Sequence, residues 1–335
     1  MKKILYIGNR LKHDKVTITS VDTLGMFLKK EGFEVRIASG IRNKFLRLID
    51  MCRAVFKYKN ETDFVLIDTY STTNFYYAVA VAWCCKKLNK PYIPILRGGN
   101  LPHRLQNDKK KSDFLFKGAK INVSPSLYLE QVFIQSGYKN VVCIPNSIEI
   151  KNYQFSQRPV KPSLLWVRSF AQIYNPLLAL QVFEKLRQDF PDATLCMVGP
   201  EKDGSLVNCK KYATDHNLPV EFTGKLSKQE WIEHSKEYAI FINTTNFDNT
   251  PVSVIEAMAL GLPVVSTNVG GIPYLIDDGR DALLVEPNSV DAFLKSLKDL
   301  LSNPQMVSSL TQNARNKAES FDWEKVKYQW FDILK

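Results

Sequence analysis

The sequence predicts an α/β fold made of two doubly wound domains that face a cleft. Short apolar runs that suit buried strands alternate with helical segments, and Gly, Pro, Asn and Asp cluster where the runs end. The same rhythm of strand, loop and helix restarts at Ser163. Such alternation is typical of βαβ units with parallel sheets, and its repetition indicates two Rossmann-like domains.

The first domain opens on a βαβ unit and continues with further strands and helices. The expected elements are strands at 2–8, 34–38, 64–68 and 92–96 and helices at 20–31 and 75–88. In the second domain, strands are expected at 163–167, 193–198, 220–222, 239–243 and 263–267, with helices at 176–189 and 252–260.

The segment 41–60 reads as a basic amphipathic helix. Its apolar side holds Phe45, Leu48, Ile49, Cys52, Val55 and Phe56. Its other faces carry Arg42, Lys44, Arg47, Arg53, Lys57 and Lys59. A helix of this kind can lie on a membrane interface, and the same pattern suits packing against its own sheet, so the sequence leaves both alternatives open.

Composition bounds the class of protein. The 335 residues, 45% hydrophobic and 24% charged, suit a globular protein of two domains. The six Cys form no C-x-x-C pair, which favours free thiols in a reducing compartment. The apolar run in MKKILYIGN is too short for a signal peptide or a membrane span, so we expect a cytoplasmic protein.

Charge is distributed unevenly along the chain. Residues 1–150 hold 25 Lys and Arg against 12 Asp and Glu, a net charge of +13, whereas the remainder carries −2. A field of this sign favours an anionic partner. Nucleic acid, an acidic polysaccharide and anionic lipid would each satisfy it.

A loop and a helix start in the second domain predict an anion site. The strand 239–243 ends in a polar loop that opens the helix 252–260. The first turn of a helix has unpaired amide groups and a partial positive charge, which together hold phosphate oxygens. Glu256, one turn deeper, can accept hydrogen bonds from sugar or ribose hydroxyls. Alternatively, Asp248 caps a turn and Glu256 is an exposed helical acid.

Asp248, seven further residues and Glu256, followed by the run AMALGLPVVSTNVGGIPYLI, resemble a known signature. It is the E-x7-E motif of retaining glycosyltransferases of family 4, which have the GT-B architecture. The resemblance implies that Glu256 contacts the ribose of a nucleotide-sugar donor and Asp248 the transferred sugar. Asp replaces Glu at the first position, which shortens the reach by one methylene. The amides between the acids would contact the diphosphate, and the donor-binding residues expected in this stretch are Asn249, Thr250, Pro251, Val252 and Ser253.

Further donor contacts follow from the same resemblance. Relatives place an Arg and a Lys of the loop 168–176 on the diphosphate, and Arg168 fits the first role. The Lys is absent, with Tyr174 and Asn175 near its place. Gly199 and Lys225 follow the next two strands, and Lys225 could help to neutralise the diphosphate.

Acceptor contacts are expected from the first domain. Glycines directly after the strand 92–96 permit close approach of the backbone to a ligand. The family often has a His in this loop, whereas Arg97 stands there in this chain and His103 follows six residues later. Each of these two is either functional or an ordinary surface residue. The expected acceptor-binding residues are Arg97, Gly98, Gly99, Asn100 and His103.

The resemblance also sets the domain organisation. The run IPNSIE, 144–149, resembles the end of the family's first domain, and the tail 320–334 resembles a closing helix that crosses back to it. Trp323, Val326, Trp330 and Phe331 would form the buried face of that helix. The predicted domains are 1–155 for the acceptor, 156–315 for the nucleotide-sugar and 316–335 for the returning helix.

The implied activity is a retaining, metal-independent transfer of a sugar from a nucleotide-sugar to a glycan or lipid-linked acceptor. This reaction would serve synthesis of cell-surface polysaccharide or glycolipid, in the cytoplasm or at the inner face of an anionic membrane. No cofactor and no metal are expected, because the sequence has no suitably placed D-x-D cluster. One alternative is a nucleotide-sugar epimerase of the same architecture. A non-catalytic nucleic-acid binder would leave the Glu256 pattern unexplained, so no nucleic-acid partner is expected.

Overall fold

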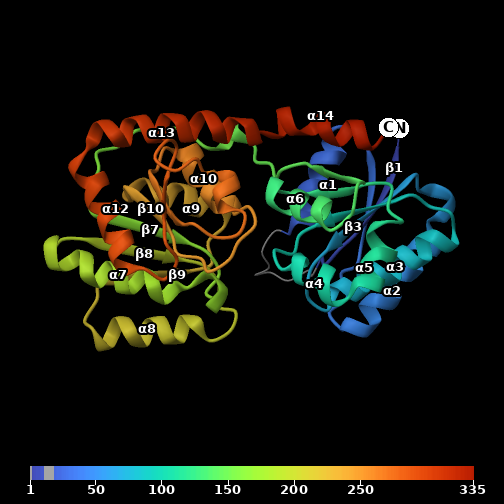
Figure 1. Ribbon diagram of the computed structural model, residues 1–335, viewed down its shortest axis with the longest axis horizontal. Helices are drawn as coiled ribbons and strands as arrows, with labels where there is room; N and C mark the ends of the chain where they lie inside the picture. Colours follow the sequence, from blue (N-terminus) through green and yellow to red (C-terminus); the bar gives the residue numbers. More distant parts are fainter. Residues whose placement is uncertain (1, 11–18) are drawn as a thin grey trace. The chain divides into compact units, whose positions relative to one another are not determined.

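The computed structural model describes residues 2–10 and 19–335. The chain divides into two compact units, which are Met1–Pro145 with Lys327–Lys335 (unit 1) and Asn146–Val326 (unit 2). Each unit contains one six-stranded sheet whose strands pair in parallel, with helices packed against it (Figure 1). The predicted α/β class with two doubly wound sheets is therefore confirmed.

The sheet of unit 1 has the strand order β2-β1-β3-β4-β5-β6. Its strands are β1 Lys3–Ile7, β2 Glu34–Ala38, β3 Phe64–Thr69, β4 Tyr92–Leu96, β5 Asn122–Ser124 and β6 Val141–Cys143. All six residues of β3 are buried, as expected of a central parallel strand with helices on both faces. Because the chain first adds β2 on one side of β1 and then β3 on the other, the strand order reverses between β1 and β3. In open α/β sheets such a switch point is where ligands bind.

Within residues 2–10 and 19–145, six α-helices accompany this sheet. They are α1 Ser20–Lys30, α2 Lys44–Lys57, α3 Asn74–Lys87, α4 Leu101–Asn107, α5 Lys109–Phe116 and α6 Leu127–Gln135. The basic segment predicted at 41–60 forms α2, but its core side differs from the prediction. Met51, Ala54 and Val55 are buried, whereas Phe45 and Phe56 are exposed. The helix therefore carries more apolar surface than its own sheet covers.

The sheet of unit 2 has the strand order β12-β11-β10-β7-β8-β9. Its strands are β7 Ser163–Val167, β8 Thr194–Val198, β9 Val220–Gly224, β10 Ile240–Asn243, β11 Val264–Thr267 and β12 Leu283–Val285. Renumbered within the unit, this is the 3-2-1-4-5-6 order of dinucleotide-binding sheets, with its switch point between β7 and β10.

Seven helices flank this second sheet. They are α7 Pro176–Asp189, α8 Ser205–Asp215, α9 Lys228–His234, α10 Val252–Leu260, α11 Ile272–Leu275, α12 Val290–Ser302 and α13 Pro304–Ala318. Helix α10 has the predicted bounds. It is buried from Ser253 to Leu260, and Gly261 ends it in the left-handed conformation with φ 81°. A β-carbon is disfavoured in that conformation, which explains why glycine stands there.

The last helix, α14, spans Trp323–Ile333. Trp323, Val326 and Trp330 are buried as predicted, and Phe331 is half-buried. From Lys327 onward its residues belong to unit 1, where Lys327 Nζ pairs with Glu31 Oε1 at 3.3 Å. Among the described residues, the helices are all too short or too polar to cross a membrane.

Candidate functional site

Four of the predicted donor residues follow four neighbouring strands of unit 2. Arg168 comes directly after β7, Gly199 after β8 and Lys225 after β9, while Asp248 lies in the loop after β10. Because neighbouring parallel strands end at the same edge of a sheet, these residues gather at one edge. Arg168 and Asp248 flank the switch point, the usual ligand position in such a sheet.

Arg168 and Asp248 form an ion pair at this point. Arg168 Nη2 donates to Asp248 Oδ2, and the side chains are only 15% and 14% exposed. The guanidinium lies over the ring of Tyr174, 4.0 Å from its centroid. Arg168 Nε, by contrast, is buried and lacks a hydrogen-bond partner within the described part of the chain. Buried donors are rarely left unpaired, so this N–H is a candidate contact for an acceptor atom.

Close backbone contacts hold the loops around the ion pair. A β-carbon on Gly199 would lie 1.7 Å from the carbonyl oxygen of Arg168, so glycine alone permits this approach. Gly270 and Gly271 play the same part beneath the other loop, where β-carbons would lie 2.3 Å from Asp248 O and 2.0 Å from Asn249 O. No role was predicted for these two glycines, although a Gly-Gly pair soon after a buried strand can indicate a close backbone contact.

Helix α10 begins beside this loop. Pro251 is its N-cap residue, and within the described residues it makes no side-chain capping hydrogen bond, unlike Ser227 at the start of α9. Ser253 Oγ, in the first turn, is buried and also lacks a partner among the described residues. Asn249 and Thr250 are buried just before the turn. An uncapped first turn with an unused hydroxyl suits a phosphate or another anion.

Glu256 lies one turn further along α10 and is 4% exposed, so it is not an exposed helical acid. Its Oε1 accepts a hydrogen bond from Tyr153 Oη at 2.6 Å and pairs with Lys228 Nζ at 2.8 Å. Burial and the neighbouring carboxylate raise the pKa of Tyr153, which keeps its hydroxyl protonated as a donor. Neither partner was predictable from the sequence, because Tyr153 is 103 positions away and carries no motif. They hold the carboxylate in one orientation.

Tyr174 and Asn175 connect the Arg168 loop to the loop after β10. The carbonyl oxygen of Tyr174 accepts from Thr244 Oγ1 at 3.1 Å. Asn175 adopts the left-handed conformation with φ 45° at the start of α7, and its Nδ2 donates to Asn246 Oδ1 at 3.3 Å. Both residues therefore position the site, and their contact with a donor stays a prediction, as does that of the exposed Lys225.

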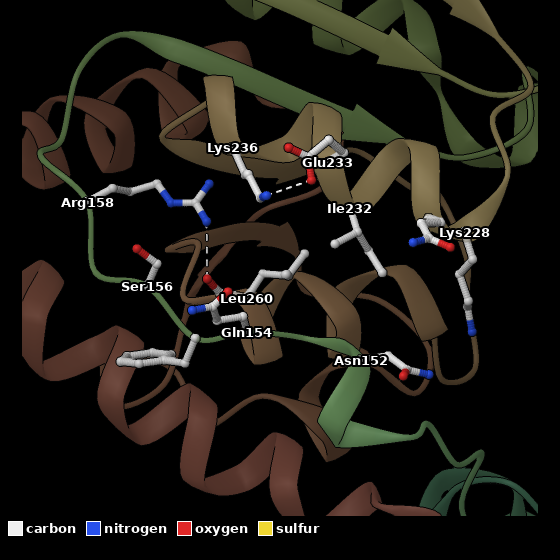
Figure 2. A pocket seen from close by; sticks show the side chains of 11 residues that line it. Asn152, Gln154, Ser156, Arg158, Lys228, Ile232, Glu233, Lys236 and Leu260 are labelled. Carbon is white, nitrogen blue, oxygen red and sulfur yellow. Dashed lines mark hydrogen bonds and ion pairs between the residues drawn. The ribbon is translucent and has the colours of Figure 1, made fainter.

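A pocket of about 760 Å³ adjoins this region in unit 2. Figure 2 shows it between α9 and the extended segment 152–158. Lys228, which pairs with Glu256, lines it. Arg158 holds the segment in place by donating to the carbonyl oxygens of Ser235 at 2.6 Å and Leu260 at 3.2 Å. The volume of the pocket is in the range of small-molecule sites.

One group of potential metal ligands also lies in unit 2. Side-chain ligand atoms of Cys196, Glu221 and His234 are within 4.8 Å of one another. These residues belong to or follow β8, β9 and α9 rather than the loops that carry Arg168 and Asp248. Metal independence of the reaction stays a prediction.

In unit 1, Arg97 belongs to a buried cluster at the β1/β3 switch point. Its Nε donates to Asp68 Oδ1 at 3.2 Å, and its Nη2 lies 3.4 Å from Tyr6 Oη. Tyr6 Oη in turn donates to Asp68 Oδ1 at 2.9 Å. Burial raises the pKa of Asp68, whose side chain is 1% exposed. Arg97 is thus not an ordinary surface residue.

The remaining predicted acceptor residues surround the start of α4. A β-carbon on Gly98 would lie 2.4 Å from Ser71 N, so this glycine allows two loops to touch. Gly99 follows it, and Asn100 is exposed at the helix start. His103 is exposed, with Nε2 2.8 Å from Asn107 Nδ2. Their contact with an acceptor stays a prediction.

Two Rossmann-like sheets, with an uncapped helix and a buried acid beside the switch point of the second, are typical of glycosyltransferases of GT-B architecture. Residues 150–317 match the family of glycosyl transferases group 1, and the chain belongs to this family. An uncharacterized glycosyltransferase of Haemophilus influenzae is 30% identical over 157 residues, which cover 46% of this chain and 44% of that protein.

Two further relatives carry names that state the kind of transfer they perform. Sulfoquinovosyl transferase SQD2 of Arabidopsis thaliana is 27% identical over 43% of this chain and 28% of its own length. A UDP-Gal:alpha-D-GlcNAc-diphosphoundecaprenol alpha-1,3-galactosyltransferase of Escherichia coli is 23% identical over 52% of this chain and 48% of its own. The chain thus spans less than half the length of each of these curated relatives.

Solved structures agree over the whole fold. Anabaena HepE in complex with UDP-glucose aligns with a TM-score of 0.80 and 16% identity, covering 100% of this chain and 99% of that one. Sucrose-phosphate synthase of Thermosynechococcus elongatus aligns with a TM-score of 0.79 and 15% identity, covering 99% and 98%. At these identities the likeness supports the GT-B fold.

Proposed function

We propose that the protein is a retaining, metal-independent glycosyltransferase that uses a nucleotide-sugar donor bound by unit 2. The observation that carries the proposal is the Arg168–Asp248 pair at the switch point, with Arg168 Nε buried and unpartnered among the described residues. A donor diphosphate supplies the missing acceptor oxygens. HepE, which shares the fold, was solved with UDP and with UDP-glucose, and this supports a donor of the same class here.

The proposed reaction divides its work between Arg168 and α10. The bond between the anomeric carbon and the diphosphate oxygen breaks while the acceptor oxygen bonds to the same face of the sugar. The acceptor hydroxyl gives its proton to the departing diphosphate. Arg168 and the first turn of α10 stabilise the negative charge that develops on that diphosphate. Asp248 contacts the sugar, and Glu256, fixed by Tyr153 and Lys228, accepts hydrogen bonds from the ribose.

The acceptor is a glycan or a lipid-linked sugar held by unit 1, in the synthesis of cell-surface polysaccharide or glycolipid. The net charge of +13 over residues 1–150 favours an acidic acceptor or an anionic membrane surface. The name of the Escherichia coli relative, which includes a diphosphoundecaprenol-linked sugar, favours the second. We accordingly place the enzyme in the cytoplasm at the inner face of a membrane.

A donor screen tests the proposal. UDP-, GDP- and ADP-sugars are added separately, and the unfolding temperature is recorded. A ligand at 100 times its dissociation constant stabilises by about 2.7 kcal/mol, so one nucleotide class should stand out. The selected donor is then incubated with and without acceptor in EDTA, and the anomeric configuration of the product is read by NMR. An inverted product or full loss of activity in EDTA would overturn the retaining or the metal-independent part.

The samples with and without acceptor also distinguish a transferase from an epimerase. An epimerase converts the donor sugar without an acceptor, whereas a transferase consumes donor in proportion to the acceptor added. Donor whose sugar is isomerised in the acceptor-free sample would replace the transferase assignment.

A further inference from the structure

Helix α2 carries a second apolar stripe besides the one in its core. Phe45, Ile49, Cys52 and Phe56 recur at intervals of four, three and four residues, which places them on one side of the helix. Phe45 is 69% exposed, Ile49 47% and Phe56 44%. The core of unit 1 is already supplied by another side of the helix, including Met51. Cys52 is half-buried and packs against that core, whereas Phe45, Ile49 and Phe56 are exposed and need another explanation.

Helix α3 faces this stripe with apolar residues of its own. Tyr76 is 41% exposed and Trp83 50% exposed, and the two lie about two turns apart on the helix. Between α2 and α3 lies a groove of about 460 Å³. Its lining is almost wholly apolar and consists of Cys52, Phe56, Tyr76, Val79, Ala80, Trp83, Cys84 and Phe114. An exposed apolar groove continuous with an exposed apolar stripe is unusual on a protein that keeps that face in water.

Cations lie at the rim of the groove, and one of them, Lys111, also pairs with Asp108 Oδ1 at 3.0 Å. Lys87 Nζ lies 5.7 Å from the centroid of the Trp83 ring, and Lys111 Nζ lies 5.3 Å from that of Tyr76. Arg53 and Lys57 are exposed on α2 beside Phe56. An apolar centre with a positive rim complements an amphiphile with a negative head. Two copies of this face would bring like charges together, which disfavours self-association through it.

We propose that the α2 stripe and the α2–α3 groove form a surface that inserts into an anionic lipid bilayer. The aromatic and aliphatic side chains enter the interface between headgroups and acyl chains, and the rim cations contact lipid phosphates. This proposal deepens the proposed function by naming the part of unit 1 that meets the membrane. The net charge of residues 1–150 alone would give a purely electrostatic attachment. The proposed surface adds insertion of apolar side chains to it.

Arg47 does not belong to this surface, although it lies in the same basic segment. It is 7% exposed, and its guanidinium donates to the carbonyl oxygens of Ile41 at 2.6 Å and Arg42 at 2.7 Å. Arg47 therefore fixes the chain that leads into α2. Substituting it would disturb the fold, so it is left out of the charge variant used in the test.

The test is sedimentation with vesicles of phosphatidylcholine, with or without phosphatidylglycerol. The full chain should bind only the vesicles with phosphatidylglycerol, and Trp83 fluorescence should shift to the blue. A combined Phe45→Gln, Ile49→Gln and Trp83→Gln variant should lose at least tenfold in vesicle affinity at unchanged unfolding temperature. The matched control is Leu127→Gln with Ile134→Gln on α6, whose side chains are 50% and 54% exposed in the same unit. This control should bind like the original protein.

The charge component is measured separately. A combined Arg53→Gln, Lys57→Gln and Lys87→Gln variant should bind more weakly at low salt and lose most of its dependence on salt. The proposal is overturned if the original protein stays in the supernatant at low salt, or if the Phe45, Ile49 and Trp83 variant sediments as the original does. A dimer that this variant abolishes, seen by gel filtration without vesicles, would instead assign the face to a second copy.

Failure of this proposal and failure of the proposed function give different results. The Phe45, Ile49 and Trp83 variant should keep its thermal shift with the nucleotide-sugar, because α2 belongs to the other unit. A protein that ignores vesicles but binds and transfers sugar keeps the proposed function without the membrane surface. A protein that binds vesicles but no nucleotide-sugar would support the membrane surface and contradict the proposed glycosyltransferase function.

Discussion

Each unit has an Arg–Asp ion pair at the switch point of its sheet, and the two pairs differ in what completes them. In unit 1 it is Arg97 with Asp68, and in unit 2 Arg168 with Asp248. The two Arg side chains are similarly buried, 12% and 15% exposed. Burial and position alone therefore cannot separate a structural pair from a functional one.

The partners of each pair make the distinction. In unit 1, Tyr6 closes a triangle, because its hydroxyl contacts both Arg97 and Asp68. In unit 2, Arg168 keeps a buried Nε that is without a partner in the described chain, and the neighbouring helix α10 keeps Ser253 Oγ in the same condition. A buried charge network whose polar groups are all hydrogen-bonded within the protein is expected to stabilise the fold. A network with buried donors that lack a protein partner is instead a candidate ligand site.

The largest effect is expected at the closed cluster. Arg97→Ala would leave Asp68 buried without its cation, and breaking a buried pair in this way costs about 3–5 kcal/mol. Unfolding in urea measures the loss. Lys211→Ala, which removes an exposed pair with Asp215, is the control and should leave the midpoint unchanged. A stable Arg97→Ala protein that binds donor but transfers no sugar would instead make Arg97 an acceptor residue.

The next effect concerns catalysis at the open pair. Arg168→Ala should lower kcat by roughly 10²–10³-fold, because a preorganised donor to the departing charge is lost in a sheltered site. Arg168→Lys should recover only part, since Lys lacks the planar fork. Steady-state transfer with the selected donor is the measurement. Full activity in Arg168→Ala would shift the role to Lys225 or to the amides of α10.

Asp248→Asn serves as the companion variant for Arg168. It keeps the shape of the side chain while removing its charge. Transfer should fall, while titration calorimetry should find binding of the nucleoside diphosphate nearly intact. Equal losses for the nucleoside diphosphate and the nucleotide-sugar would place Asp248 outside the sugar site and make it a partner of Arg168 alone.

Glu256 should have a smaller effect, and on donor affinity. A hydrogen bond to a charged group contributes about 1.5–3 kcal/mol, so Glu256→Ala should weaken nucleotide binding at least about tenfold. Tyr153→Phe is the matched control, because it removes one hydroxyl that holds Glu256 but keeps the carboxylate. Calorimetry should show the larger loss for Glu256→Ala. Equal losses would mean that Glu256 acts within the fold and not on the ribose.

Local patterns explain why much of this fold was predictable. The strand and helix rhythm predicted the class. The end of α10 was predictable because Gly261 can adopt the left-handed conformation that ends a helix and Pro263, two residues later, cannot continue one. The motif that starts at Asp248 likewise marked the loop after β10 and the start of α10, which lie beside the switch point of the sheet. These signals lie within a few residues of the feature they predict.

Contacts between distant positions explain what was missed. Tyr153 reaches Glu256 across 103 positions and Tyr6 reaches Asp68 across 62, and no periodicity in the sequence records such pairs. The α2 helix shows a related limit. Its apolar arc is wider than its core requires, so the pattern alone could not tell that Val55 is buried while Phe45 and Phe56 are exposed.

The smallest predicted effect tests the open site most directly. Ser253 Oγ is buried at the first turn of α10 without a partner in the described residues, so Ser253→Ala removes no hydrogen bond from the free protein. The unfolding midpoint without ligand should therefore stay the same or rise slightly, since an unpaired buried hydroxyl is costly. If the hydroxyl binds the diphosphate, donor affinity should fall by about 0.5–1.5 kcal/mol, or roughly two- to twelvefold. Calorimetry with the selected nucleotide-sugar separates the two quantities. A Ser253→Ala protein that loses stability but keeps its donor affinity would show that the hydroxyl serves the fold, and that an unused buried donor does not mark the ligand site here.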